Sequence, residues 1–136
     1  MTNYILNIGL NVSKHEVKNS KLTESELNRA IYYQAHNLMF GIDKARDDVN
    51  ITYLEVATPE NCDKVNEPTL VVYLNADVTE SHMHEDIVLN LSRILKQDCI
   101  ALYNEDTQQG VLIGERASEW GTFDGSYFVE KKDIKN

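Results

Sequence analysis

The sequence predicts a single α+β domain with a ferredoxin-like β-α-β-β-α-β order, and three observations support this fold class. Apolar patterns of strand period and of helix period alternate along the chain in that order. A further short strand follows a turn and adds a C-terminal hairpin strand to the sheet. The 136 residues, 42% of them apolar, suffice for one domain with its own core. We expect both helices to lie on one face of the sheet.

The first strand and the first helix have clear local signals. Apolar residues alternate with polar ones over residues 4–12, which predicts a half-buried strand. Thr23 and Glu26 stand at the spacing of a capping box, in which each side chain accepts a hydrogen bond from the other residue's backbone amide. Apolar residues then recur at helical spacing, and Gly41 is a candidate end cap. We therefore predict a helix over residues 24–40.

The middle of the chain predicts two strands and a second helix. Residues 51–58 are rich in β-branched and aromatic side chains and end at Pro59, as expected for a strand. Residues 69–74 form an unbroken apolar run, which favours a central strand buried on both faces. Thr79 is the predicted cap of a helix that ends near Lys96. Its apolar stripe consists of Met83, Ile87, Leu91, Ile94 and Leu95.

The C-terminal part predicts a hairpin followed by a tail. Residues 99–103 and 111–114 are predicted strands, and residues 104–110 form the turn between them. We place a single α+β domain at residues 1–118 and an aromatic, charged tail at residues 119–136. Large aromatic residues of the tail either cover the sheet or anchor an interface between subunits. These residues are Trp120, Phe123, Tyr127 and Phe128.

Charge is concentrated in the middle third of the chain. The whole sequence has a formal charge of −9, and residues 47–92 contain ten carboxylates against one lysine. Such an acidic surface repels nucleic acid and attracts a basic protein. We expect six of these carboxylates to converge at one end of the sheet and to bind the partner; the alternative is a solvated face that only aids solubility. The six are Asp47, Asp48, Glu55, Glu60, Asp63 and Glu67.

No sequence motif for catalysis or for metal binding is present. The chain lacks the nucleophile, zinc-protease and phosphate-loop patterns. His82 and His84 are two positions apart, so a helix directs them to different sides and they cannot share one metal ion. His82 and Asp86 could lie on one face, but two ligands are fewer than zinc requires. We predict no enzymatic activity, no metal and no cofactor.

Three arginines are candidates for binding an anionic ligand, either alone or at the seams between subunits: Arg46, Arg93 and Arg116. The simpler interpretation for Arg93 is that it complements the dipole at the end of the second helix. Cys62 and Cys99 are far apart in sequence, and we expect free thiols in a reducing compartment. No targeting or membrane-spanning segment is evident, so we expect a cytoplasmic protein that does not contact membranes.

Three segments carry a family resemblance. They are Tyr4-Ile-Leu-Asn-Ile-Gly-Leu, Pro68-Thr-Leu-Val-Val-Tyr-Leu, and the run from Leu95 to Tyr103 in which a helix leads into the last core strand through Leu-Lys-Gln-Asp-Cys-Ile. Together with the capped first helix, they make residues 4–114 similar to small ferredoxin-like proteins encoded by phages and mobile elements. The resemblance implies the fold and a genomic setting. It carries over no catalytic residue.

These observations lead to three hypotheses of function. The first is a non-enzymatic acidic protein, a phage-type inhibitor that binds a basic host defence protein or complex in the host cytoplasm. The second is an oligomeric protein that sequesters an anionic nucleotide messenger through its arginines. The third is a structural module whose aromatic tail mediates homo-oligomer formation.

Overall fold

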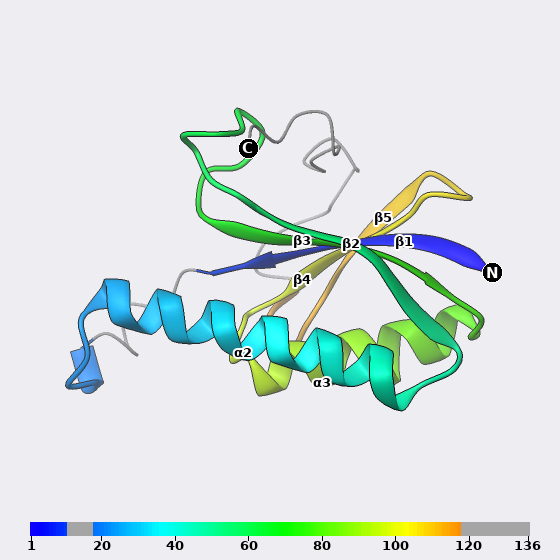
Figure 1. Ribbon diagram of the computed structural model, residues 1–136, viewed down its shortest axis with the longest axis horizontal. Coiled ribbons are helices and arrows are strands. Elements are labelled where there is room, and N and C mark those ends of the chain that lie inside the picture. Colours follow the sequence, from blue (N-terminus) through cyan, green and yellow to red (C-terminus); the bar gives the residue numbers. More distant parts are fainter. Residues whose placement is uncertain (11–17, 118–136) are drawn as a thin grey trace.

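The computed structural model describes residues 1–10 and 18–117, which form a mixed α+β structure with a five-stranded sheet (Figure 1). This arrangement is compatible with the predicted ferredoxin-like α+β fold. In chain order the elements are β1 (Thr2–Gly9), α2 (Glu24–Ala45), β2 (Val49–Ala57), β3 (Thr69–Ala76), η1 (His82–Val88), α3 (Leu89–Ile94), β4 (Ile100–Asn104) and β5 (Gln109–Ile113).

The sheet has the strand order β2-β3-β1-β4-β5, and every neighbouring pair is antiparallel. β1 pairs with both β3 and β4, so the first strand of the chain lies in the middle of the sheet. β3 lies between β1 and β2, which confirms the internal position predicted from its apolar run. β2 and β5 are the two edge strands.

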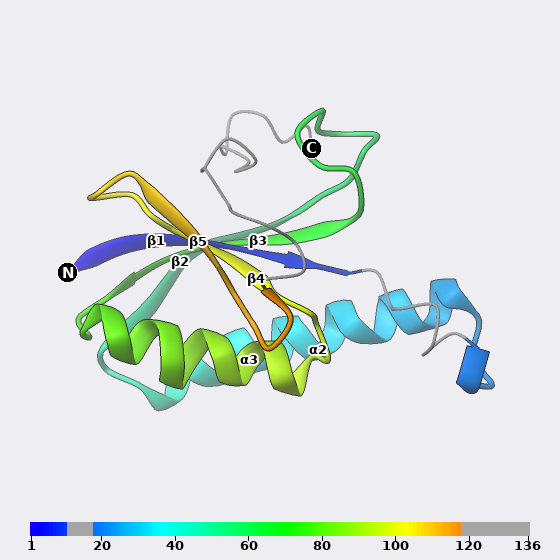
Figure 2. The same cartoon turned by 180° about the vertical axis from the view of Figure 1, so that it is seen from behind.

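Both helical segments cover one face of the sheet, as predicted. Figures 1 and 2 show α2 and the η1–α3 segment on the same side when the molecule is seen from opposite directions. The main core lies between them and the sheet, where Leu6, Ile8 and Met39 have at most 1% of their surface exposed. Alternate strand residues point to the other face, where Val71 and Tyr73 pack in a second cluster. The β2–β3 loop contributes buried side chains to this cluster.

The capping box of α2 is formed, whereas the predicted end of the helix is wrong. Thr23 Oγ1 accepts a hydrogen bond from the Glu26 amide at 3.2 Å, and Glu26 Oε1 accepts one from the Thr23 amide at 3.2 Å. These bonds hold the pKa of Glu26 below its usual value. The helix continues through Gly41 to Ala45, because Ile42 extends the buried stripe and its carbonyl accepts from the Arg46 amide at 3.0 Å.

The second helix begins as predicted but is wound differently. Thr79 Oγ1 accepts a hydrogen bond from the His82 amide at 3.1 Å. The segment that follows is a π-helix, η1, which passes into α3 without a break. The predicted apolar stripe is buried at four of its five positions, while Ile94 is 50% exposed. Leu91 and Leu95, four positions apart, already fill the side that faces the sheet, so Ile94 lies beside it.

The β4–β5 hairpin confirms the predicted C-terminal hairpin strand. Asn104 Oδ1 accepts hydrogen bonds from the amides of Asp106 and Thr107, which shapes the turn. The two cysteines of the described chain are free, and burial is the main cause that raises the pKa of the Cys99 thiol. The predicted tail, with Trp120, Phe123, Tyr127 and Phe128, lies outside the described residues.

Candidate functional site

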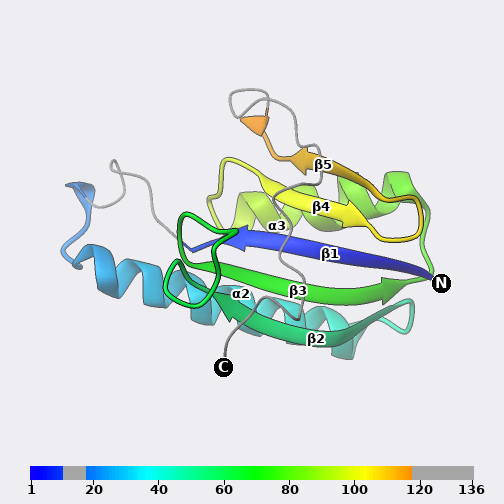
Figure 3. The same ribbon diagram turned by 90° about the horizontal axis from the view of Figure 1, so that it is seen from above.

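The six carboxylates predicted to bind a partner do not converge. Asp47 and Asp48 precede β2, and Glu55 lies within it. The other three follow the strand in the β2–β3 loop: Glu60, Asp63 and Glu67. β2 has nine residues, which corresponds to about 26 Å from end to end at ~3.3 Å per residue. The predicted convergence is therefore wrong, because two loops that flank one strand lie at its opposite ends (Figure 3).

A different set of carboxylates does gather at one end of the sheet. In the antiparallel register, Ala76 at the end of β3 lies opposite both Val49 and Thr2, and Asn104 at the end of β4 lies opposite Tyr4. The α2–β2 loop, the segment after β3 and the β4–β5 turn therefore lie at the same end (Figure 3). We call their carboxylates the acidic edge: Asp47, Asp48, Asp77, Glu80, Glu105 and Asp106.

The pKa of Tyr4 indicates that carboxylates from two of these segments act on the same phenol group. Burial is the first cause that raises the pKa of the Tyr4 phenol above its usual value. The negative charges of Glu80 and Asp106 raise the same pKa further. Glu80 follows β3 and Asp106 lies in the β4–β5 turn, so side chains far apart in sequence contribute to one negative field.

Asp48, one carboxylate of the acidic edge, is paired with an arginine within the chain. The guanidinium of Arg46 donates to Asp48 through Nε at 2.8 Å and through Nη2 at 2.9 Å. This bidentate hydrogen bonding holds the pKa of Asp48 below its usual value. Asp48 is therefore engaged by Arg46, whereas the neighbouring Asp47 is exposed.

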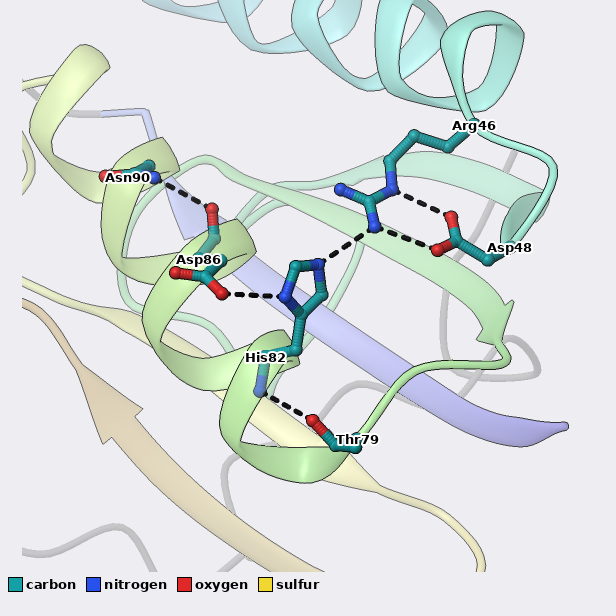
Figure 4. Close-up of polar contacts among 6 residues, drawn as sticks. All are labelled: Arg46, Asp48, Thr79, His82, Asp86 and Asn90. Carbon is teal, nitrogen blue, oxygen red and sulfur yellow. Dashed lines mark hydrogen bonds and ion pairs between the residues drawn. The ribbon is translucent and has the colours of Figure 1, made fainter.

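The same guanidinium reaches η1 and forms a polar chain with it. Arg46 Nη2 lies 2.9 Å from His82 Nε2, and His82 Nδ1 lies 2.7 Å from Asp86 Oδ2 (Figure 4). Because a guanidinium can only donate, His82 Nε2 must accept here, and the ring proton is on Nδ1, directed at Asp86. The chain Asp48–Arg46–His82–Asp86 thus links the end of α2 to the first turn of η1.

The hydrogen-bonded chain contains a histidine and an aspartate, as a general base does, but they are not arranged for catalysis. The His82–Asp86 contact confirms the prediction that these side chains share a helix face. An aspartate on Nδ1 orients a catalytic histidine, but catalysis would need Nε2, and here Nε2 accepts from Arg46. His84 turns away to Glu80, at 3.6 Å. Within residues 1–10 and 18–117, no three side chains are grouped so that they could hold a metal ion.

An open groove runs along α2 and ends at the polar chain. Its volume is about 620 Å³, and its surface is mostly apolar. The side chains that line it are Gln34, Asn37, Leu38, Gly41, Ile42, Ala45 and Arg46. Arg46 therefore belongs both to the groove and to the chain of hydrogen bonds that leads to Asp48 and Asp86.

Within one chain, the three candidate arginines do not form one anion site. Arg46 lies beside the acidic edge, whereas Arg93 and Arg116 lie at the other end of the sheet. Each faces a carboxylate: Arg93 Nε lies 2.7 Å from Glu115, and Arg116 Nη1 lies 3.7 Å from Asp98. An anion would have to displace these carboxylates.

Sequence reasoning missed four members of the acidic edge: Asp77, Glu80, Glu105 and Asp106. A signal for them was present, because Asp77 and Glu80 come just after one predicted strand and Glu105 and Asp106 just after another. In the predicted topology, these two strands finish at the same end of the sheet at which β2 begins.

Comparison of the chain with protein-family models, with curated proteins and with solved structures gave no match. The resemblance to proteins of phages and mobile elements therefore stays a prediction. In the part of the chain that the structure describes, no helix is both long enough and apolar enough to cross a membrane.

Proposed function

We propose that the protein binds a basic partner through the acidic edge and does not act as an enzyme. The observation that carries the proposal is the gathering of six carboxylates from three separate segments at one end of the sheet. In these segments and the last turn of α2, the basic side chains are Lys44 and Arg46, and Asp43 adds a seventh carboxylate, so the region carries a formal charge of −5. A field of one sign steers an oppositely charged protein and orients its approach.

The strand order also supports the finer fold assignment. Without β5, the order is β2-β3-β1-β4, and the connections through α2 and η1–α3 both lie on one face. Such a split β-α-β arrangement is that of a ferredoxin-like fold. It supports the proposal because it explains why three segments far apart in sequence meet at one end.

A matched pair of variants tests the proposal. The edge variant carries Asp77→Asn, Glu80→Gln and Asp106→Asn, and the control variant carries Glu55→Gln, Glu60→Gln and Asp63→Asn. Both remove three negative charges. The probe is a peptide rich in lysine and arginine, titrated by calorimetry at low and high salt. We expect the edge variant to bind it about tenfold more weakly, with a smaller dependence on salt, and the control variant to bind as the natural protein does.

Equal weakening by the two variants would contradict the proposal. It would mean that the peptide senses only the total charge, as expected of a solvated face that serves solubility. The control variant contains three of the carboxylates that sequence reasoning assigned to the partner. It therefore also distinguishes the acidic edge from that earlier assignment.

The narrower hypotheses stay predictions. In the first hypothesis the basic partner is a host defence complex. To test it, the partner must first be isolated from host cells. Sequestration of an anionic nucleotide would require the carboxylates that face the three arginines to move. Oligomer formation through the aromatic tail concerns residues outside the described ranges.

A further inference from the structure

The groove along α2 has the length of a short helix. Its lining extends from Gln34 to Arg46 on one side of α2, which corresponds to about 18 Å at 1.5 Å per residue. Three turns of a second helix have a similar length. Leu38 and Ile42 provide apolar surface to the groove. Both side chains are half-buried and also pack against the main core. A helix that lies in an apolar groove buries residues spaced i, i+4 and i+7, which such a length accommodates.

Gly41, in the centre of the groove, has no packing role among the residues that the structure describes. A Cβ atom added to it would meet no atom of the described residues within 4 Å, and its φ lies outside the left-handed region that favours glycine. Glycine inside a helix costs ~0.5–1 kcal/mol relative to alanine. The chain thus has a destabilising residue at a position where the described structure has room for a side chain. A glycine there, with Ala45 one turn further on, lets another helix backbone come close to α2.

The carboxylates near one end of the groove indicate which kind of ligand it would bind. Arg46 ends the groove, and Asp48 and Asp86 lie on either side of its hydrogen-bonded chain. Asp48 belongs to the acidic edge, and the exposed Asp47 directly precedes it in the chain. An occupant with an apolar face and a basic end matches both the apolar lining and the negative end.

We infer that the groove binds an amphipathic helix of the partner protein, with its apolar face on Leu38, Gly41 and Ile42 and its basic end against the acidic edge. This inference rests on the proposed function, since the helix belongs to the same basic partner. A second copy of α2 matches the groove less well. It begins with Glu24 and Glu26 and ends beside Asp47, so either orientation would bring carboxylates to the acidic edge.

A leucine at the centre of the groove tests the inference. The probe is a fluorescent helical peptide with leucines spaced i, i+4, i+7 and a run of lysines at one end, measured by anisotropy. Gly41→Leu fills the groove with a better helix former, so we expect a folded protein that binds the peptide at least about tenfold more weakly. The control is Ala30→Leu, one turn before the groove on the exposed surface of α2, which we expect to bind within about twofold of the natural protein. Circular dichroism checks that both variants are folded.

Three results would overturn the inference. One is equal binding by the natural protein and Gly41→Leu. Another is equal binding of a peptide with the same composition whose leucines are scrambled around the helix. The third is a natural protein that sediments as a dimer, becomes monomeric on Gly41→Leu and does not bind the peptide, since a second copy would then occupy the groove.

The edge variant distinguishes failure of this inference from failure of the proposed function. If Asp77→Asn, Glu80→Gln and Asp106→Asn weaken peptide binding while Gly41→Leu does not, the acidic edge binds the partner and the groove does not. If Gly41→Leu alone weakens binding, the groove holds a helix whose basic end does not contribute, and the proposed function fails.

Discussion

The two ends of the sheet contain similar numbers of carboxylates but differ in how these are balanced. The acidic edge has six carboxylates, and beside them lie Asp43, Lys44 and Arg46 at the end of α2. At the opposite end, the β2–β3 loop, the segment from the end of α3 to β4 and the residues after β5 have five, and four basic side chains accompany them. The carboxylates there are Glu60, Glu67, Asp63, Asp98 and Glu115, and the basic residues are Lys64, Arg93, Lys96 and Arg116.

The difference teaches that the total charge of the chain is a poor guide to its binding surface. At the opposite end, ion pairs join separate elements, as between Arg93 near the end of α3 and Glu115 after β5. At the acidic edge, the ion pair of Arg46 is with Asp48, only two residues away, and its contact with η1 is a hydrogen bond to His82. Mixed charges at one end hold elements together, whereas charges of one sign at the other form a field that a partner can sense.

The largest expected effect concerns the packing of the opposite end. A Cβ atom at Gly114 would lie 2.6 Å from Cys99 Cα and would clash with the carbonyl of Asp98. We expect Gly114→Ala to lower the free energy of unfolding by about 2–3 kcal/mol, because backbone atoms on both sides would have to move. Urea denaturation measures it, with Gly41→Ala as the control, since a Cβ there meets no described atom within 4 Å. A Gly114→Ala protein as stable as the natural one would show that the opposite end is not tightly packed.

A smaller effect is expected from the polar chain beside the acidic edge. Arg46→Met keeps an aliphatic side chain but removes the hydrogen bonds to Asp48 and His82. We expect a small loss of unfolding free energy at neutral pH, since these bonds are partly exposed to solvent. The loss should be measured by urea denaturation across the acid range.

The acid dependence of that loss follows from Asp48. Its pKa in the folded protein is lowered by Arg46, so its contribution is complete above its usual value of 3.8 and disappears as the pH falls below it. The natural protein and Arg46→Met should therefore become equally stable in acid. A difference that persists with Asp48 protonated would mean that Arg46 acts mainly through other contacts.

Much of the fold could be predicted because its signals are local. The strand β1, the capping box of Thr23 and Glu26 and the internal strand β3 were each predicted from neighbouring residues, and all three were confirmed. β1 is nevertheless buried on both faces and not half-buried, because Ile5 packs in the second cluster. The end of α2 could not be predicted in this way. Gly41 is a common helix terminator, but Ile42 gains more by packing on the core than the helix loses at the glycine.

The site was harder to predict because it depends on which strand ends meet. The sequence places Asp47 and Asp48 near Glu60 and Asp63, but β2 separates the two groups. Conversely, Asp48 and Asp106 are 58 residues apart in the sequence and share one end of the sheet through the pairing of β1 with β3 and β4. The Arg46–His82 contact similarly depends on the packing of α2 beside η1.

The smallest expected effect compares single charges at the two ends directly. Asp106→Asn removes one of several like charges at the acidic edge, so we expect it to raise the free energy of unfolding by about 0.2–0.5 kcal/mol. Glu115→Gln breaks the 2.7 Å ion pair with Arg93 at the opposite end, and we expect it to lower that free energy by a similar ~0.2–0.5 kcal/mol.

The opposite signs are the decisive feature of this last comparison. Urea denaturation at low and high salt measures both variants, and both differences should shrink as salt screens exposed charges. Two variants that shift the free energy in the same direction would show that the two ends do not differ in local charge balance. The acidic edge would then be one part of a uniformly negative surface, with nothing to direct a basic partner toward it.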